Sequence, residues 1–80
     1  MAEASYQSTR QALAARIKQR RAELGVSQEV LALEAGIDRT FVSQIERGVG
    51  NPSLRILCQL ADRLGVPVAA MLSVDGIDGW

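Results

Sequence analysis

Between Ser27 and Gly48 the sequence contains the same short pattern twice. Each unit begins with a residue that caps helix N-termini, continues for about two turns with an apolar face, and ends at a glycine. Gly36 ends the first unit, and Asp38 begins the second after a single intervening residue, Ile37. So short a connection does not allow antiparallel packing, because the helices must meet at a sharp corner. The sequence therefore predicts two short helices joined at an angle.

A longer helix is expected before this pair, starting at Thr9. Leu13, Ile17 and Leu24 lie on one helical stripe, and the glycine that follows Leu24 supplies the left-handed conformation that ends many helices. Residues 1–8 are polar and small and have no apolar period. We interpret them as a flexible N-terminal arm.

A fourth helix is expected between Ser53, which caps it, and Gly65, which ends it. Its inner stripe is formed by Leu54, Leu57, Ala61 and Leu64. Pro67 at a first helical position begins a last short helix, and residues 73–80 are interpreted as a C-terminal tail. Together these signals predict an all-α fold, a compact domain of five helices over residues 9–72.

Composition supports one small helical domain. A chain of 80 residues closes a single core, and with 48% apolar but only 4% aromatic residues that core must be largely aliphatic. No apolar run approaches the roughly 20 residues of a membrane span, so a soluble, cytoplasmic protein is expected. Cys58 is the single cysteine, which excludes an internal disulfide and fits a reducing compartment. Because it lies next to the inner stripe of the fourth helix, we expect it in the core.

The chain lacks the residues of a catalytic site. It has no histidine, one cysteine and no carboxylates at metal-ligand spacing, so no enzyme activity, metal or cofactor is expected. Nine basic and nine acidic residues give a formal net charge of zero. The charges are unevenly placed, with five basic residues among residues 1–25 and an acidic C-terminal end, which indicates a polarised surface.

The second helix of the angled pair carries a polar outer row. A helix presented in this way fits the major groove of B-DNA, which is roughly 12 Å wide. Arginine can bond guanine in a fork, and glutamine can pair with adenine. The candidate base-reading residues are Arg39, Thr40, Phe41, Ser43 and Gln44. The alternatives are a polar face that only meets solvent and, for Phe41, an aromatic ring that fills a gap between helices.

Several segments at fixed offsets resemble the Xre family of phage-repressor-type regulators. The resemblance covers about residues 13–72, and within the family it is greatest to the controller proteins of restriction-modification systems. The segments are Val26-Ser27-Gln28-Glu29, Leu31-Ala32, Gly36, Asp38-Arg39-Thr40-Phe41, Val42-Ser43-Gln44-Ile45-Glu46-Arg47-Gly48, Asn51-Pro52-Ser53-Leu54 and Leu64-Gly65-Val66. The resemblance implies a helix-turn-helix protein that binds DNA as a dimer and activates or represses genes.

The resemblance also implies roles for single residues. Gln28 is assigned to a phosphate contact, in agreement with the free N–H groups of a helix N-terminus, and we place Ser27 and Asn51 beside it. Arg21 and Glu46 are expected to form a partly buried ion pair that holds the reading helix. The dimer contact is expected on the last helix, through Val66, Val68, Met71 and Leu72; for Met71 and Leu72 the alternative is that they close the core of the monomer.

Two positions depart from the family pattern. Arg20 stands where the family usually buries a leucine, and we expect Leu24 to cover the thinner stripe. Gly50 stands where the family often has arginine or lysine, which removes a phosphate contact. With a net charge of zero, the affinity for DNA is expected either to be modest or to depend on dimer formation.

The expected partners are a double-stranded DNA operator with pseudo-palindromic half-sites and a second copy of the chain. RNA polymerase is a further candidate partner, and no membrane partner is expected. The resemblance places such a regulator in a bacterial or phage context, at the nucleoid. The alternative function is a protein–protein adapter that uses the same helical domain. The sequence assigns no role to the N-terminal arm or to Trp80.

Overall fold

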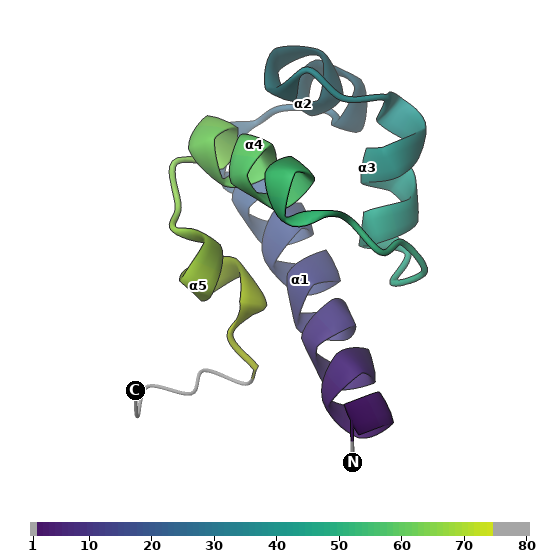
Figure 1. The fold of residues 1–80 in the computed structure, drawn as a ribbon. Helices are drawn as coiled ribbons and strands as arrows, with labels where there is room; N and C mark the ends of the chain where they lie inside the picture. The colour runs from purple at the N-terminus through teal and green to yellow at the C-terminus, as the bar shows by residue number, and fades with distance from the viewer. Residues whose placement is uncertain (1, 75–80) are drawn as a thin grey trace.

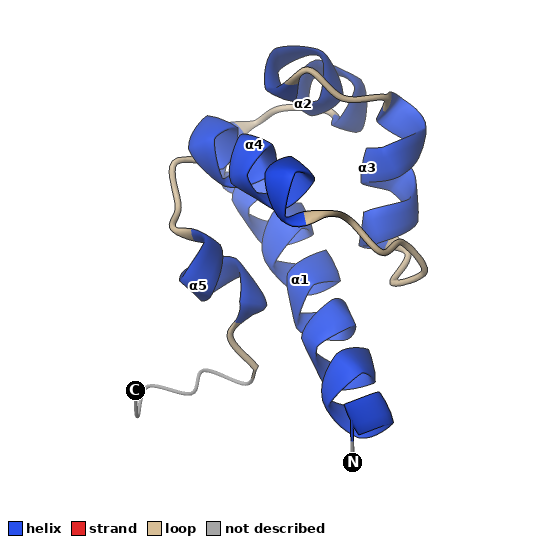
Figure 2. Cartoon of the chain, in the orientation of Figure 1, coloured by secondary structure: helices blue, strands red, loops and turns tan. Residues whose placement is uncertain are grey.

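Cap residues and glycines divide the chain into five helices. A computed structural model describes residues 2–74, in which no strand forms (Figure 1; Figure 2). The helices are α1 (Ala2–Leu24), α2 (Gln28–Ala35), α3 (Arg39–Glu46), α4 (Leu54–Leu64) and α5 (Val68–Leu72). The prediction of an all-α domain with five helices is confirmed. Over the same residues, none of the helices combines the length and the apolarity that crossing a membrane requires.

The predicted caps are present at the N-termini of three helices. The Ser27 hydroxyl accepts a hydrogen bond from the Val30 backbone N–H at 3.0 Å. The Asp38 carboxylate accepts one from the Thr40 backbone N–H at 2.8 Å, and Ser53 caps α4 through its hydroxyl. These contacts satisfy N–H groups that have no partner within the helix, and so they locate each helix start.

Gly36 makes the corner between α2 and α3 possible. Its φ of 74° lies in the left-handed region, which costs glycine little and other residues more. The Gly36 and Ile37 N–H groups donate to carbonyls of the last turn of α2, at 3.3 and 3.0 Å. The chain thereby leaves α2 and reaches the α3 cap within two residues, as the sequence predicted.

The first helix is longer than expected. α1 begins at Ala2 rather than at Thr9, so residues 2–8 are helical and the expectation of a loose arm is corrected. This segment contains neither glycine nor proline, and a helix that is already anchored at its C-terminal half extends at little cost. The guanidinium of Arg10 also lies 4.8 Å from the centre of the Tyr6 ring, one turn away.

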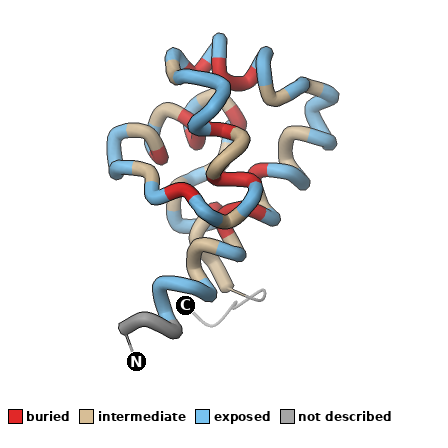
Figure 3. The backbone as a smooth tube through the Cα atoms, turned by 90° about the vertical axis from the view of Figure 1, so that its right-hand side faces the viewer, coloured by how far each residue is buried: buried red, intermediate tan, exposed pale blue. Residues whose placement is uncertain are grey.

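The core lies between the C-terminal half of α1 and the four shorter helices. α1 packs against α3, α4 and α5, and α2 packs against α3 and α4 (Figure 1). Figure 3 shows buried positions alternating with exposed ones along the chain. The core residues are Leu13, Ile17, Leu31, Ala32, Ala35, Val42, Ile45, Leu57, Leu60, Ala61, Leu64 and Met71.

Two residues expected on inner faces, Leu54 and Cys58, lie at the surface. Leu54, at the first position of α4, is 69% exposed, because the buried stripe of that helix begins one turn later at Leu57. Val30 of α2 is also exposed. Cys58 was expected in the core and is exposed, because it follows Leu57 by about 100° around the helix.

Arg20 is accommodated by a hydrogen bond instead of by a shift of Leu24. Its Nε donates to the Leu64 carbonyl at 2.8 Å, which provides a partner for an acceptor in the last turn of α4. Leu24 remains 38% exposed, so the expectation that it covers the stripe is wrong. The arginine therefore connects α1 to the C-terminal end of α4.

Candidate DNA interface

α3 has a buried side and a solvent-exposed side. Val42 and Ile45 are almost completely buried in the core, whereas Arg39 and Thr40 are exposed. Figure 3 faces the side of the molecule on which α3 lies in Figure 1, and it shows buried and exposed positions on that side. Because its inner residues attach it to the core, its outer side chains can reach a partner without unfolding the helix.

The other three base-reading candidates are on the same helix. Phe41 is 42% exposed, which argues against the alternative in which the ring fills a gap between helices. Ser43 and Gln44 are half-buried. The structure therefore brings the five candidates together on one short helix, and Arg39, Thr40 and Phe41 at its N-terminal end are the most exposed.

The predicted phosphate contacts come from two places. Ser27 and Gln28 lie at the N-terminus of α2, and Asn51 is exposed in the segment between α3 and α4. The Ser27 hydroxyl already accepts the capping hydrogen bond from Val30, so it retains only its own O–H for a phosphate. The backbone N–H groups of the first turn of α2 add the favourable end of the helix dipole.

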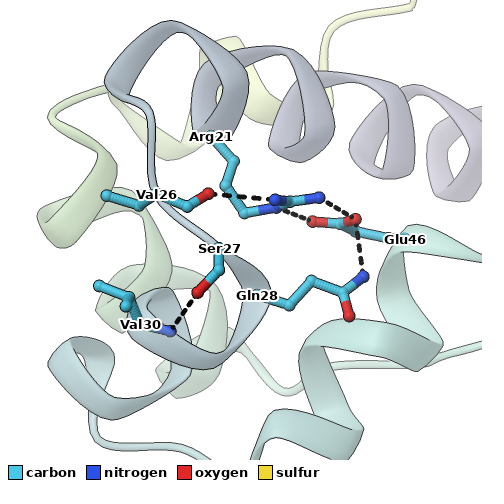
Figure 4. Close-up of polar contacts among 6 residues, drawn as sticks. All are labelled: Arg21, Val26, Ser27, Gln28, Val30 and Glu46. Carbon is cyan, nitrogen blue, oxygen red and sulfur yellow. Dashed lines mark hydrogen bonds and ion pairs between the residues drawn. The ribbon is translucent and has the colours of Figure 1, made fainter.

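Arg21 and Glu46, predicted as an ion pair, are in contact in the structure (Figure 4). Arg21 Nε donates to Glu46 Oε2 at 2.8 Å, and Arg21 Nη2 donates to Glu46 Oε1 at 2.9 Å. The remaining terminal nitrogen, Nη1, donates to the Val26 carbonyl at 3.1 Å. This two-point contact fixes the last turn of α3 against the last turn of α1.

Gln28 joins this pair, a contact that the sequence analysis missed. Its Nε2 donates to Glu46 Oε1 at 3.0 Å (Figure 4), and among the described residues its second amide N–H has no acceptor. A glutamine at a helix start and a glutamate 18 residues later have no sequence signal that pairs them. One carboxylate thereby connects the C-terminal end of α3 to the phosphate candidate of α2.

The surroundings of Glu46 keep it charged. Burial raises the pKa of its carboxyl, but the hydrogen bonds from Arg21 and Gln28, with the charges of Arg21 and Lys18, outweigh burial, so the pKa lies below its ordinary value. The hydrogen bond with Glu46 raises the pKa of Arg21 further. Both partners are therefore ionised wherever the chain is folded near neutral pH.

Two exposed cations on either side of the connection between α3 and α4 were not named in the sequence analysis. Arg47 follows α3 directly, and Arg55 lies in the first turn of α4. Both flank the segment that contains Asn51, and arginine bonds phosphate oxygens in a fork. The sequence signal for Arg47 was present, because it belongs to the matched run that ends at Gly48.

Gly50 packs closely against the end of α3. A Cβ atom there would lie 3.1 Å from the Ile45 backbone nitrogen and 3.2 Å from the Gln44 carbonyl carbon. Its own N–H donates to the Gln44 carbonyl at 3.0 Å. The absence of an arginine or lysine at this position therefore lets the chain pack tightly against the end of α3.

The residues expected at a dimer contact are not equally available. Met71 is 1% exposed because its side chain belongs to the core of the monomer, so its assignment to the dimer surface is corrected in favour of the alternative, core closure. Val66, Val68 and Leu72 are half-buried and pack only partly against the core. Pro67 lies at the N-cap of α5 and not at its first helical position, because the helix begins at Val68.

The arrangement of the helices agrees with a family comparison. A helix-turn-helix family model matches residues 17–70, which contain α2, α3 and α4 completely. The chain belongs to the helix-turn-helix family. The resemblance to Xre-type regulators is confirmed, since similar proteins include a phage immunity repressor and restriction-modification controller proteins. The first 16 residues, which include the whole N-terminal half of α1, precede the matched region.

Relatives of known description support the same class. A protein of Archaeoglobus fulgidus described as an uncharacterized HTH-type transcriptional regulator is 32% identical over 65 residues, which cover 81% of this chain and 93% of that protein. A hypothetical transcription factor of Neisseria meningitidis is 39% identical over 66 residues, covering 82% of this chain. The aligned part is 62% of the length of the Neisseria protein.

Solved structures of this family superpose well on the chain. The hypothetical transcription factor NHTF from Neisseria gives a TM-score of 0.81 at 37% identity, covering 88% of this chain and 80% of that chain. The biofilm regulator SinR in complex with DNA gives 0.73 at 39% identity, covering 76% and 98%. The restriction-modification controller protein C.AhdI from Aeromonas hydrophila gives 0.73 at 34% identity, covering 78% and 94%.

Proposed function

We propose that the chain is a transcriptional regulator that binds a double-stranded DNA operator as a homodimer and reads base edges with α3. The observation that supports this most directly is the row of Arg39, Thr40 and Phe41, exposed on a helix whose opposite side is buried. A rigid helix that presents arginine and hydroxyl groups outward has the shape and the donors that the major groove requires. The SinR structure, whose title names a complex with DNA, supports the same use of the fold.

The remaining contacts divide by type. Arg39 and Gln44 are proposed to bond base edges, with Ser43 allowing close approach. Gln28, Ser27 and Asn51 are proposed to contact phosphates, and we now add Arg47. Because phosphate contacts orient the protein without reading sequence, their loss should weaken binding to all DNA alike.

The dimer is proposed to form through the surface of α5, where Val66, Val68 and Leu72 are partly exposed. A two-fold axis there would relate two copies of α3 across a separation of about 34 Å, which is one turn of B-DNA. The operator should then be a pseudo-palindrome with half-sites one turn apart. The net charge of zero makes the second copy important, since one domain adds few phosphate contacts.

Control of restriction-modification genes is the narrower proposal. The similarity to C.AhdI and to the control protein C.BamHI supports it, although the similarity to SinR is of the same size. Transcription in vitro from a promoter that carries the selected operator, with purified RNA polymerase, would distinguish activation from repression. If the dimer bound to the operator recruits RNA polymerase directly, the polymerase is a partner of this chain.

Selection of duplexes from a random DNA library tests the main proposal. We expect a pseudo-palindrome and an affinity that falls steeply with salt. Arg39→Ala should cost about 1–3 kcal/mol and relax the preference at one base pair of each half-site, as expected for loss of a forked contact. Gln28→Ala should weaken all sequences equally.

Arg16→Ala is a matched control, because it removes a cation from α1 on a groove next to Ser73 and away from α3. It should leave sequence preference unchanged. Binding that is weak, insensitive to sequence and unaffected by Arg39→Ala would contradict DNA reading. That result would favour the protein–protein adapter.

A further inference from the structure

A small apolar groove lies beside the N-terminal half of α1. Its walls come from α1, from the segment before α4, from α4 and from α5, and they are almost entirely apolar. Residues that line the groove include Tyr6, Arg10, Leu13, Pro52, Leu57 and Leu72. The groove has a volume of about 210 Å³. At about 30 Å³ per water molecule it holds roughly seven waters, which is room for one or two side chains and not for a helix.

Arg10 gives this groove a cation that has no ion-pair partner among the described residues. Its Nε is buried and has no hydrogen-bond partner among the described residues. The rest of the guanidinium lies over the Tyr6 ring, and Nη1 makes only a long contact of 3.4 Å with the Tyr6 hydroxyl. The guanidinium of this half-buried arginine is therefore weakly paired, and a carboxylate in the groove would give its terminal nitrogens a charge-assisted hydrogen bond.

We propose that the occupant of the groove is the C-terminal segment of the same chain, residues 75–80. This segment, which lies outside the described residues, contains Ile77 and Trp80, and it contains two acids, Asp75 and Asp78, with no basic residue. The indole of Trp80 matches a small apolar groove, because a buried tryptophan removes 150–250 Å² from water. The carboxylate of Asp78 supplies the acceptor for Arg10.

The segment can reach the groove. Leu72, which precedes the segment by three residues, is itself one of the residues that line the groove. From Leu13, which also lines it, back to Tyr6 is a distance along α1 of about 10 Å, at 1.5 Å per residue. Six extended residues span up to about 20 Å, so a segment that turns back after Val74 is long enough to run along the groove.

Charge favours the same occupant. Arg10 lines the apolar groove, and Arg16 lines a second groove on another side of α1, next to Ser73. The part of α1 beside the end of α5 therefore carries cations that attract an acidic segment. When the segment docks, it covers apolar surface on residues 2–16 of α1, the part of the helix that precedes the family match.

Trp80 is the single tryptophan of the chain and reports its own docking. In the intact 80-residue protein, with excitation chosen to avoid Tyr6, we expect its emission to be shifted to the blue of that of a peptide of residues 73–80. Quenching by acrylamide should be several-fold weaker in the protein than in the peptide. Emission and quenching equal to those of the peptide would overturn the proposal.

Variants show whether Trp80 is protected from acrylamide by this groove or by another part of the chain. Tyr6→Ala and Arg10→Ala should each raise quenching towards the peptide value, with circular dichroism confirming that the helices remain. Lys18→Ala, which removes an exposed cation from the same helix outside both grooves, should leave quenching unchanged. Asp78→Asn changes only the segment, so it tests the Arg10 contact without risk to the core, and it should also raise quenching.

The oligomeric alternative gives a different result. If the segment enters the groove of a second copy, protection of Trp80 will depend on protein concentration and will disappear on dilution. That dependence would overturn docking within one chain. Protection that is constant over the whole concentration range, and that is reduced by Arg10→Ala but not by Lys18→Ala, would establish it.

Discussion

Two ion pairs join helices that are distant in the sequence, and they differ in their surroundings. Arg21 and Glu46 join α1 to α3 through two hydrogen bonds, with side chains that are 23% and 4% exposed. Arg63 and Glu34 join α4 to α2 through one contact, with side chains that are 33% and 42% exposed. Both pairs have the same chemistry, so the difference in burial should decide what each contributes.

The comparison shows how α3 is held. Water can solvate Glu34 and Arg63 almost as well when they are apart, so their contact stabilises the fold little. Glu46 has lost its water, and removing one partner leaves the other uncompensated. The fold therefore depends more on the ion pair between α1 and α3 than on the pair between α4 and α2.

Glu46→Ala should have the largest effect. It leaves Arg21 and Gln28 without their shared acceptor and opens a cavity in the last turn of α3, so the free energy of unfolding should fall by about 3 kcal/mol. Urea unfolding followed by circular dichroism measures this. A loss as small as that for Glu34→Ala would show that burial does not distinguish the two pairs.

Gly50→Ala tests the same end of α3 without changing a charge. The added methyl would lie 3.1 Å from the Ile45 nitrogen, and a helix backbone cannot easily move away. The free energy of unfolding should fall by about 1–2 kcal/mol, the usual cost of overpacking. Unchanged or increased stability would show that the segment after α3 can shift, and that packing there is looser than the distances indicate.

Lowering the pH should reduce the stabilisation by the Arg21–Glu46 pair, because the pKa of Glu46 lies below its ordinary value in the folded chain. A carboxyl whose pKa is lower in the folded state stabilises the fold fully above its unfolded pKa, about 4.3 for glutamate. That contribution is lost as the pH falls through the folded pKa. Urea unfolding from pH 6 down to pH 3 should show a steeper loss for the wild-type chain than for Glu46→Gln. Equal slopes would assign the acid sensitivity to other carboxyls.

Glu34→Ala and Arg63→Ala should have the smallest effects. Each should change the free energy of unfolding by at most about 0.5 kcal/mol, because the pair is exposed and screened by salt. The double variant completes a cycle whose coupling energy measures the pair directly. A coupling above about 1 kcal/mol would mean that the exposed pair also fixes α2 on α4, and the contrast between the two regions would fail.

Much of the candidate site could be predicted from the local sequence. The exposed row on α3 follows from Asp38 as a cap and from the spacing of Val42 and Ile45, which are buried. The hydrogen bond from Gln28 to Glu46 could not be predicted, because it depends on how α2 and α3 pack against each other after the turn at Gly36. The availability of Met71 depended in the same way on the packing of α5 against α1.

The sequence by itself determined where α2, α3 and α4 begin and end, because a cap or a left-handed glycine satisfies backbone groups within a few residues of its own position. Only the tertiary structure decided which apolar residues are covered. Leu54 and Met71 have similar apolar side chains, yet one is exposed and the other buried, because a neighbouring helix covers only the second. Burial depends on contacts between distant segments, and no local pattern contains them.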